Sequence, residues 1–272
     1  MQEVILEAKR PVAKYWKELF KAKELLGFFT LRDVLVRYKQ ATLGVAWALF
    51  RPLITMAIFT LIFGKLANFP SEGVAYPLFA LAGMVPWLFF SGAMTETTTC
   101  LLNNPALLTR IYFPRMVLPL SQILVQGVDF GISFVLLLTL TPFLGSFSFS
   151  TLGWLPLYFL ILFILTTGWG LILSSLTVKW RDVRFIVPFF VQLGMYASPV
   201  GYGSFMIPEK WLWLYYLNPL AGVIEGFRYA LFGVKAPFLF GATLMAFCIS
   251  LTSLYVGTQV FRRVERDFGD LI

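Results

Sequence analysis

The stretch WLPLYFLILFILTTGWGLILSSLTV, residues 154–178, contains no charged residue. An α-helix of about 20 apolar residues is long enough to cross the hydrocarbon core of a membrane, because each residue adds about 1.5 Å. A strand of a transmembrane β-barrel would instead alternate apolar and polar residues over about 10 positions, and this stretch does not. It therefore predicts a transmembrane helix and favours an all-α fold.

The composition of the 272-residue chain agrees with this prediction. Hydrophobic residues make up 58% of the chain and charged residues 13%, and the mean hydropathy is +0.78. Soluble domains have roughly 45 to 50% apolar and 25% charged residues, so we expect an integral membrane protein with no room for a soluble enzyme domain. Six apolar runs predict six transmembrane helices, at about 43–64, 77–94, 116–142, 154–178, 185–203 and 237–261.

A further apolar run, residues 211–232, is interrupted by Asn218-Pro219. If it is not a span, most of the lysines and arginines fall on one side of the membrane, and the positive-inside rule places both termini in the cytoplasm. We therefore expect residues 204–235 to form an external helical hairpin before the last span. This hairpin either re-enters the membrane, where protein must cover its irregular backbone, or lies on the outer surface.

Residues 1–42 are expected to form a cytoplasmic interface region, and residues 43–272 the six-span domain. The segment VAKYWKELFKAKELL, residues 12–26, has apolar residues on one side of a helix and charged residues on the other. This pattern is typical of an amphipathic helix at the membrane interface, whose lysines face anionic lipid headgroups. Simple membrane anchoring would explain it equally well. Cytoplasmic loops also account for the net charge of +8, so we expect membrane lipids as partners and no nucleic acid.

Several kinds of chemistry are not expected in this chain. It has no histidine, which is the commonest general base and metal ligand. Its two cysteines, Cys100 and Cys248, lie far apart and indicate neither a disulfide framework nor a metal site. The sequence has no G-x-x-x-x-G-K-[ST] phosphate loop, so any ATP must bind to another chain. We therefore expect no catalytic residue, no cofactor and no metal in this chain.

Six stretches, taken in order, together resemble the permease subunit of the ABC exporters that move polysaccharides such as O-antigen, capsule and teichoic acid. They are RYKQATLGVAWALFRPL (37–53), GMVPWLFFSGAM (83–94), NPALLTRIYFPRMVLPL (104–120), RDVRFIVPFF (181–190), SPVGY (198–202) and YYLNPLAGVIEGFRYALF (215–232).

The resemblance implies a homodimer in the cytoplasmic (inner) membrane and two separate ATPase subunits, which bind ATP and Mg. It also implies a lipid-linked polysaccharide as the substrate. The alternatives are a related permease for drugs or lipids, or a multispan enzyme that acts on lipid-linked sugars. The acidic residues of the external loops are scattered, which argues against the enzyme.

The resemblance also implies that two cytoplasmic segments contact the ATPase subunits. Residues 101–115 contain two prolines, which interrupt a helix and leave backbone groups available to a partner. Residues 179–184 form a short, charged loop. Positive-inside anchoring would also explain the arginines of both segments. The coupling candidates are Asn104, Arg110, Phe113, Pro114, Arg115, Arg181, Asp182 and Arg184.

The aromatic content of 18% suggests a substrate pathway. Sugar rings present flat C–H faces that stack on aromatic side chains, whereas aromatic residues also pack against lipid in any membrane protein. The pathway candidates on the first two spans are Trp47, Phe59, Phe63, Trp87, Phe89 and Phe90.

Charges inside apolar segments are the sharper signal, because one near the bilayer centre costs at least about 2.5 to 3.5 kcal/mol. Arg51 falls about 12 Å along the first span, next to Pro52, where we expect a kink. The family resemblance implies an uncharged polar residue before this proline, so Arg51 departs from the pattern. Arg51 is expected either to contact the carrier's pyrophosphate or to have a structural role, by pairing with Asp129 of the third span or by snorkelling to the cytoplasmic face. Glu225 and Arg228, three residues apart, are expected to pair and hold the hairpin together.

Overall fold

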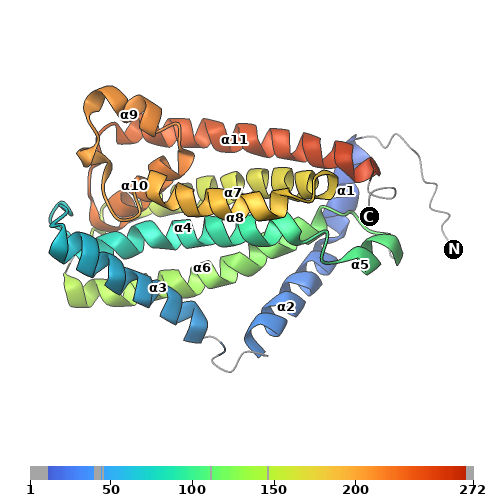
Figure 1. Cartoon of the computed structure of the whole chain (residues 1–272), viewed down its shortest axis with the longest axis horizontal. Helices are drawn as coiled ribbons and strands as arrows, with labels where there is room; N and C mark the ends of the chain where they lie inside the picture. Colours follow the sequence, from blue (N-terminus) through green and yellow to red (C-terminus); the bar gives the residue numbers. More distant parts are fainter. Residues whose placement is uncertain (1–11, 40–43, 45, 111, 146, 268–272) are drawn as a thin grey trace.

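The structure is a computed structural model that describes residues 12–39, 44, 46–110, 112–145 and 147–267, without the side chains of residues 12–14, 109 and 110. Every regular element among these residues is a helix, so the predicted all-α fold is confirmed (Figure 1). The helices are α1 (Val12–Lys21), α2 (Lys23–Lys39), α3 (Ala46–Phe59), α4 (Tyr76–Thr99), α5 (Pro105–Arg110), α6 (Val117–Leu144), α7 (Leu155–Lys179), α8 (Val183–Ala197), α9 (Glu209–Tyr215), α10 (Pro219–Phe232) and α11 (Leu239–Val264). A π-helical segment, Thr60–Leu66, prolongs α3, and single 3-10 turns lie at Leu152–Trp154, Ser204–Met206 and Glu265–Asp267.

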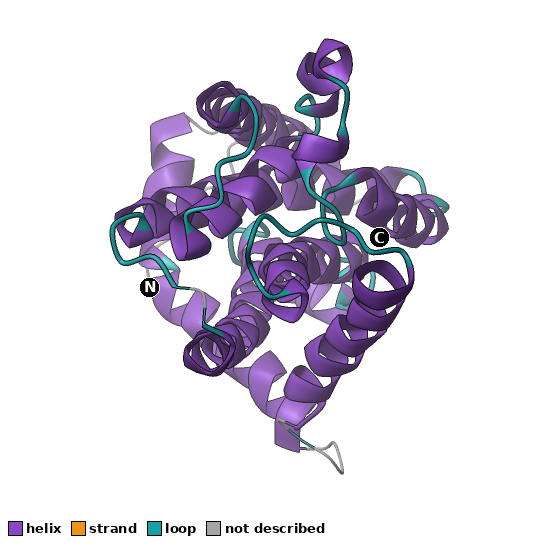
Figure 2. Cartoon of the chain, turned by 90° about the vertical axis from the view of Figure 1, so that its left-hand side faces the viewer, coloured by secondary structure: helices purple, strands orange, loops and turns teal. Residues whose placement is uncertain are grey.

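Five helical segments are long and apolar enough to cross a membrane. They are Ala46–Leu66, Tyr76–Thr99, Val117–Leu144, Leu152–Lys179 and Leu239–Val264, and each coincides with a predicted span to within a few residues. The long helices run side by side, with α1 and α5 at one end of the bundle and α9 at the other (Figure 1). We call these the α1 end and the α9 end, and Figure 2 looks onto the α9 end.

The predicted span at 185–203 is wrong at its second boundary, because α8 ends at Ala197. Its 15 residues extend about 22 Å, which is less than the roughly 30 Å of a hydrocarbon core. Ser198 has an extended backbone with ψ of 150°, since a residue that precedes proline avoids the helical region. Residues 198–203 are therefore an irregular segment that joins α8 to the hairpin.

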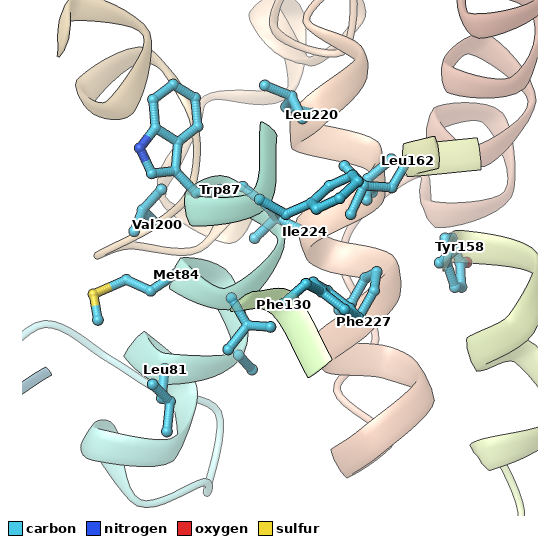
Figure 3. Packing of buried hydrophobic residues seen from close by; sticks show 14 of the residues in the cluster. Leu81, Met84, Trp87, Phe130, Tyr158, Leu162, Val200, Leu220, Ile224 and Phe227 are labelled. Atoms are coloured by element: carbon cyan, nitrogen blue, oxygen red, sulfur yellow. The ribbon is translucent and has the colours of Figure 1, made fainter. Parts of the chain in front are cut away.

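The core of the bundle surrounds α4. In the most apolar 18-residue stretch of α4, 78% of the residues are buried, against 6% in the corresponding stretch of Ala46–Leu66, which contains α3. Leu81, Met84 and Trp87 of α4 belong to the same buried cluster as Ile224 and Phe227 of α10, the helix that runs beside α4 (Figure 3). Since lipid is as apolar as these side chains, their close packing rather than their removal from water holds such helices together.

Helices α7 and α11 approach each other closely at two glycines. A Cβ atom on Gly168 would lie 2.5 Å from the backbone nitrogen of Leu254, and one on Gly257 would lie 2.3 Å from the carbonyl oxygen of Gly168. Only hydrogen fits at these positions, so the two backbones approach each other as in other membrane helix pairs with small residues at the interface.

The predicted hairpin is broken at Asn218-Pro219, as expected. The Asn218 side chain accepts a hydrogen bond from the backbone nitrogen of Leu220 at 3.1 Å and so caps α10. The two arms differ: α9 exposes Trp211 and Trp213, whereas α10 is buried along most of its length among α4, α7 and α11. Burial of α10 inside the bundle favours the re-entrant alternative over a hairpin on the surface.

The predicted amphipathic helix of residues 12–26 is two helices, since Ala22 is a turn between α1 and α2. Tyr15, from the apolar side, is buried against protein at the α1 end, in a cluster with Phe29, Phe113 and Phe261. The prediction that this whole apolar side faces the membrane is therefore wrong for Tyr15. Phe20, in contrast, is 77% exposed.

Candidate functional site

A cavity of about 910 Å³ lies between α3, α4, α6 and α8, next to the end of α2. Charged side chains and aromatic rings both line it. It brings together four of the seven predicted pathway residues, which are Arg51, Trp47, Trp87 and Phe89. Trp47 is exposed to it from α3, whereas Trp87 and Phe89 belong to the buried wall formed by α4.

The other three pathway candidates lie elsewhere. Phe59 and Phe63 have ring centroids 5.2 Å apart and pack near the irregular segment 198–203, where a Cβ atom on Gly201 would lie 2.8 Å from Phe59. Phe90 is partly buried, and its ring centroid is 6.2 Å from that of Trp87. These three rings therefore pack against protein and do not line the cavity.

A cluster of charges occupies one wall of the cavity. Arg37 Nη1 lies 2.6 Å from Asp129 Oδ2, and Arg37 Nη2 lies 3.1 Å from Glu96 Oε1. The Tyr38 hydroxyl donates a further hydrogen bond to Asp129. The amide oxygen of Gln126, in the orientation that satisfies both of its polar groups, accepts from Arg37 at 2.9 and 3.0 Å. These contacts join α2 to α4 and α6.

The predicted pair between Arg51 and Asp129 is wrong, because Arg37 occupies Asp129 instead. Arg51 lies on the opposite wall, on α3, and makes no ion pair within the described part of the chain. Arg37 was missed because the RYKQ segment reads as the cytoplasmic margin of the first span. The sequence indicated only that Arg37 lies close to an apolar run. That position does not reveal that α2 packs along α6.

The predicted pair of Glu225 and Arg228 is confirmed, with 3.6 Å between Arg228 Nη1 and Glu225 Oε1. Both side chains are fully buried. The Arg228 guanidinium lies 3.5 Å from the centroid of the Phe79 ring, a cation–π contact with α4. It also donates hydrogen bonds to the carbonyl oxygens of Phe79, Val200 and Tyr202, at 3.2, 2.9 and 2.9 Å.

Glu225 completes this arrangement from the other side. Its Oε1 accepts a hydrogen bond from the backbone nitrogen of Ser204 at 2.8 Å. The pair therefore does more than link two turns of α10, since it fastens the irregular segment between α8 and the hairpin to the centre of the bundle. That segment has few backbone partners of its own, and the buried charges supply them.

The predicted coupling residues lie at the α1 end. Arg181, Asp182 and Arg184 are exposed at the start of α8, and the Arg184 guanidinium lies 4.6 Å from the Phe185 ring. Phe113, in contrast, is buried, with its ring centroid 5.8 Å from that of Phe29.

The remaining coupling candidates take part in local contacts. Asn104 donates from Nδ2 to the carbonyl oxygen of Cys100 at 2.8 Å and closes the end of α4. Pro114 is half-buried before α6, and Arg115 contacts Glu265. The side chain of Arg110 lies outside the described residues. Thus 181–184 is an exposed charged patch, whereas Phe113 serves the packing of the bundle.

Comparisons with known proteins identify the family. The family model for ABC-2 type transporters matches residues 24–232. The O-antigen export system permease protein RfbA of Klebsiella pneumoniae is 29% identical over 255 residues, which cover 92% of this chain and 95% of that protein. RfbA of Myxococcus xanthus is 26% identical over 94% of this chain and 98% of its own length. The polysialic acid transport protein KpsM of Escherichia coli is 25% identical over 86% of this chain and 91% of its own length.

The family match begins in α2 and ends with α10, so it contains the cavity, the charged cluster and the hairpin. The chain is a membrane protein that belongs to the ABC-2 type transporter family.

Proposed function

We propose that this chain is the transmembrane subunit of an ATP-driven exporter that moves a lipid-linked, O-antigen-like polysaccharide across the cytoplasmic membrane. The observation that carries the proposal is the similarity to O-antigen export permeases over more than nine-tenths of the chain, 92% and 94% in two cases. On this proposal the chain is not itself an enzyme. ATP and Mg bind to two separate ATPase subunits, both termini of this chain lie in the cytoplasm, and the α1 end of the bundle faces the cytoplasm.

The cavity supports this function through its mixed chemistry. Aromatic rings suit the flat faces of sugars without requiring one orientation, which a polymer that slides through the site needs. Trp47 lies one helical turn before Arg51, so the two side chains share one face of α3. An aromatic ring beside a guanidinium is a suitable surface for a sugar joined to a phosphate.

A second copy of the chain is proposed to cover the open sides of the cavity. The helices α3 and α8, which flank the cavity, expose apolar side chains over most of their length; examples are Phe50, Ile54, Phe189, Phe190 and Leu193. Two copies that meet through these faces would enclose the pathway between them. The exposed patch 181–184, together with α5, is the proposed surface for the ATPase subunits.

Arg51 is the proposed contact for the carrier's pyrophosphate. Its side chain is exposed on the cavity wall and has no ion-pair partner in the described residues that it would have to give up. A guanidinium can donate two parallel hydrogen bonds to phosphate oxygens, and such charge-assisted bonds are about twice as strong as neutral ones.

The test is deletion of this gene in its host, followed by complementation. The deletion should abolish one surface polysaccharide and trap its lipid-linked precursor inside the cell. The Arg51→Gln variant should restore about one-tenth or less of the export, because a hydrogen bond to a charged group contributes about 1.5 to 3 kcal/mol. Lys65→Gln is the matched control, because Lys65 lies on the π-helical segment that prolongs α3 but does not line the cavity. This variant should restore export fully.

Two outcomes separate the parts of this proposal. A deletion strain that keeps all its surface polysaccharides would refute the transport function. A deletion that removes the polymer, combined with full export by Arg51→Gln, would refute only the role of Arg51 and leave it a snorkelling side chain.

A further inference from the structure

The far end of α11 contacts the loop that precedes α6. Glu265 Oε1 accepts a hydrogen bond from the backbone nitrogen of Arg115 at 2.9 Å. In return, the Arg115 guanidinium donates to the backbone carbonyl oxygen of Glu265 at 3.2 Å. These two residues are 150 positions apart in the chain, so the contact is a reciprocal clamp between two distant segments.

Glu265 also places an acceptor and a negative charge near the amino end of α6, which has no side-chain cap of its own. The first backbone N–H groups of a helix have no partner within the helix, and its amino end carries a partial positive charge. Met116, which precedes α6, provides no side-chain cap. The Glu265 carboxylate, from the 3-10 turn that follows α11, therefore places a negative charge where this helix of 28 residues favours one.

A third segment, α1, meets the same carboxylate. Tyr15 is 5% exposed, and burial raises the pKa of its hydroxyl, which the charge of the nearby Glu265 raises further. The guanidinium of Arg262, one turn before Glu265, lies 5.3 Å from the centroid of the Tyr15 ring. Phe261 and Phe113 belong to the same buried cluster, so apolar packing supports the polar contacts.

We propose that Glu265 is a positioning residue that couples the loop 112–116 to α1 and α11. This inference rests on the proposed function, in which ATPase subunits act at the α1 end. Helix α11 packs along α7 over much of its length, so it is a rigid element of the bundle. With Glu265 in place, a displacement of the loop moves α6 together with α1 and α11. Without it, the loop can move about Pro114 while the bundle stays still.

The experiment measures ATP hydrolysis and polysaccharide export in the same complex of this chain with its ATPase subunits. In Glu265→Ala the complex should still assemble and hydrolyse ATP within about twofold of the wild-type rate, whereas export should fall about tenfold, as expected when a hydrogen bond to a charged group is lost. The ratio of ATP hydrolysed to polymer exported should therefore rise. A role in stability alone would lower both rates by the same factor.

Glu265→Gln is the second variant, because it keeps the side-chain volume and an acceptor for the Arg115 N–H but removes the charge. It should give an intermediate ratio, and it provides the answer if Glu265→Ala does not assemble. Arg263→Ala, an exposed position two residues earlier at the end of α11, is the matched control and should leave the ratio unchanged.

Equal losses of hydrolysis and export, or a wild-type ratio of ATP hydrolysed to polymer exported in both Glu265 variants, would overturn the role of Glu265. The proposed function would be unaffected by these results. A wild-type chain that neither binds an ATPase nor changes its turnover would overturn the proposed function, and this inference with it.

Discussion

Replacement of Arg228 by methionine should destabilise the α9 end of the bundle. Arg228 is fully buried, and its guanidinium contacts the Glu225 carboxylate, three carbonyl oxygens and the Phe79 ring. Methionine is a long, flexible, apolar side chain that fills much of the same space. The change therefore removes the charge and the donors but opens no large cavity, and it leaves Glu225 buried without its cation.

The free energy of unfolding should fall by about 3 to 5 kcal/mol, which is the usual cost of removing one partner of a buried ion pair. The carbonyl oxygens of Val200 and Tyr202 add to this cost only in part, because their segment is not helical and can shift towards other donors. If Glu225 is also replaced by glutamine, the unpaired charge disappears. The double variant should then be more stable than the sum of the single effects by about 0.5 to 3 kcal/mol.

The measurement is reversible unfolding of the purified chain in mixed micelles with increasing dodecyl sulfate, followed by tryptophan fluorescence. Lys235→Met, an exposed position just after α10, is the matched control and should change the stability by no more than about 0.5 kcal/mol. A loss below about 1 kcal/mol for Arg228→Met would refute the reasoning. So would single effects of Glu225→Gln and Arg228→Met that add to within about 0.5 kcal/mol.

Two further predictions concern packing and reactivity. Gly168→Val should lower the free energy of unfolding by at least about 1 to 3 kcal/mol in the same assay, because its Cβ atom would collide with the backbone of α11. The control, Gly127→Ala, has open space around it and should leave the stability unchanged or raise it by up to about 1 kcal/mol. In a Cys248→Ala background, Cys100 should resist iodoacetamide up to pH 9 until the chain is unfolded, because the thiol is buried and burial raises its pKa; rapid alkylation of the native chain would contradict this.

The parts of the fold that follow from local sequence were predictable. A membrane helix depends on an unbroken apolar run, so the run at 154–178 identified α7 almost to its ends. The break of the hairpin depends on Asn218-Pro219 alone, and the pairing of Glu225 with Arg228 depends on a spacing of three within one helix. The error at the end of α8 came from counting apolar residues through SPVGYG, where proline and two glycines end the helix.

Contacts between distant segments could not be predicted in this way. Arg37 and Asp129 are 92 positions apart, and their meeting depends on how α2 packs along α6. The same limit applies to Glu265, which looks like one charge among many at the end of the chain. Local pattern also identified Glu225 and Arg228 as a pair, but it did not reveal that Arg228 holds Phe79, Val200 and Tyr202. Sequence thus located most of the elements and a part of the cavity, whereas the charge network required the packed helices.

The distribution of charge across the cavity bears on how a substrate would lie in it. The wall formed by α2, α4 and α6 places two carboxylates, Asp129 and Glu96, around the single cation Arg37, so this wall is negative when all three are ionised. The wall formed by α3 carries Arg51 with no ion-pair partner among the described residues. An anion that entered the cavity would be repelled by the first wall and attracted by the second, and in a site partly shielded from water both effects are stronger than in solution. Under the proposed function, the pyrophosphate of the carrier therefore faces α3, and the sugar joined to it lies beside Trp47, the exposed ring on the same helix.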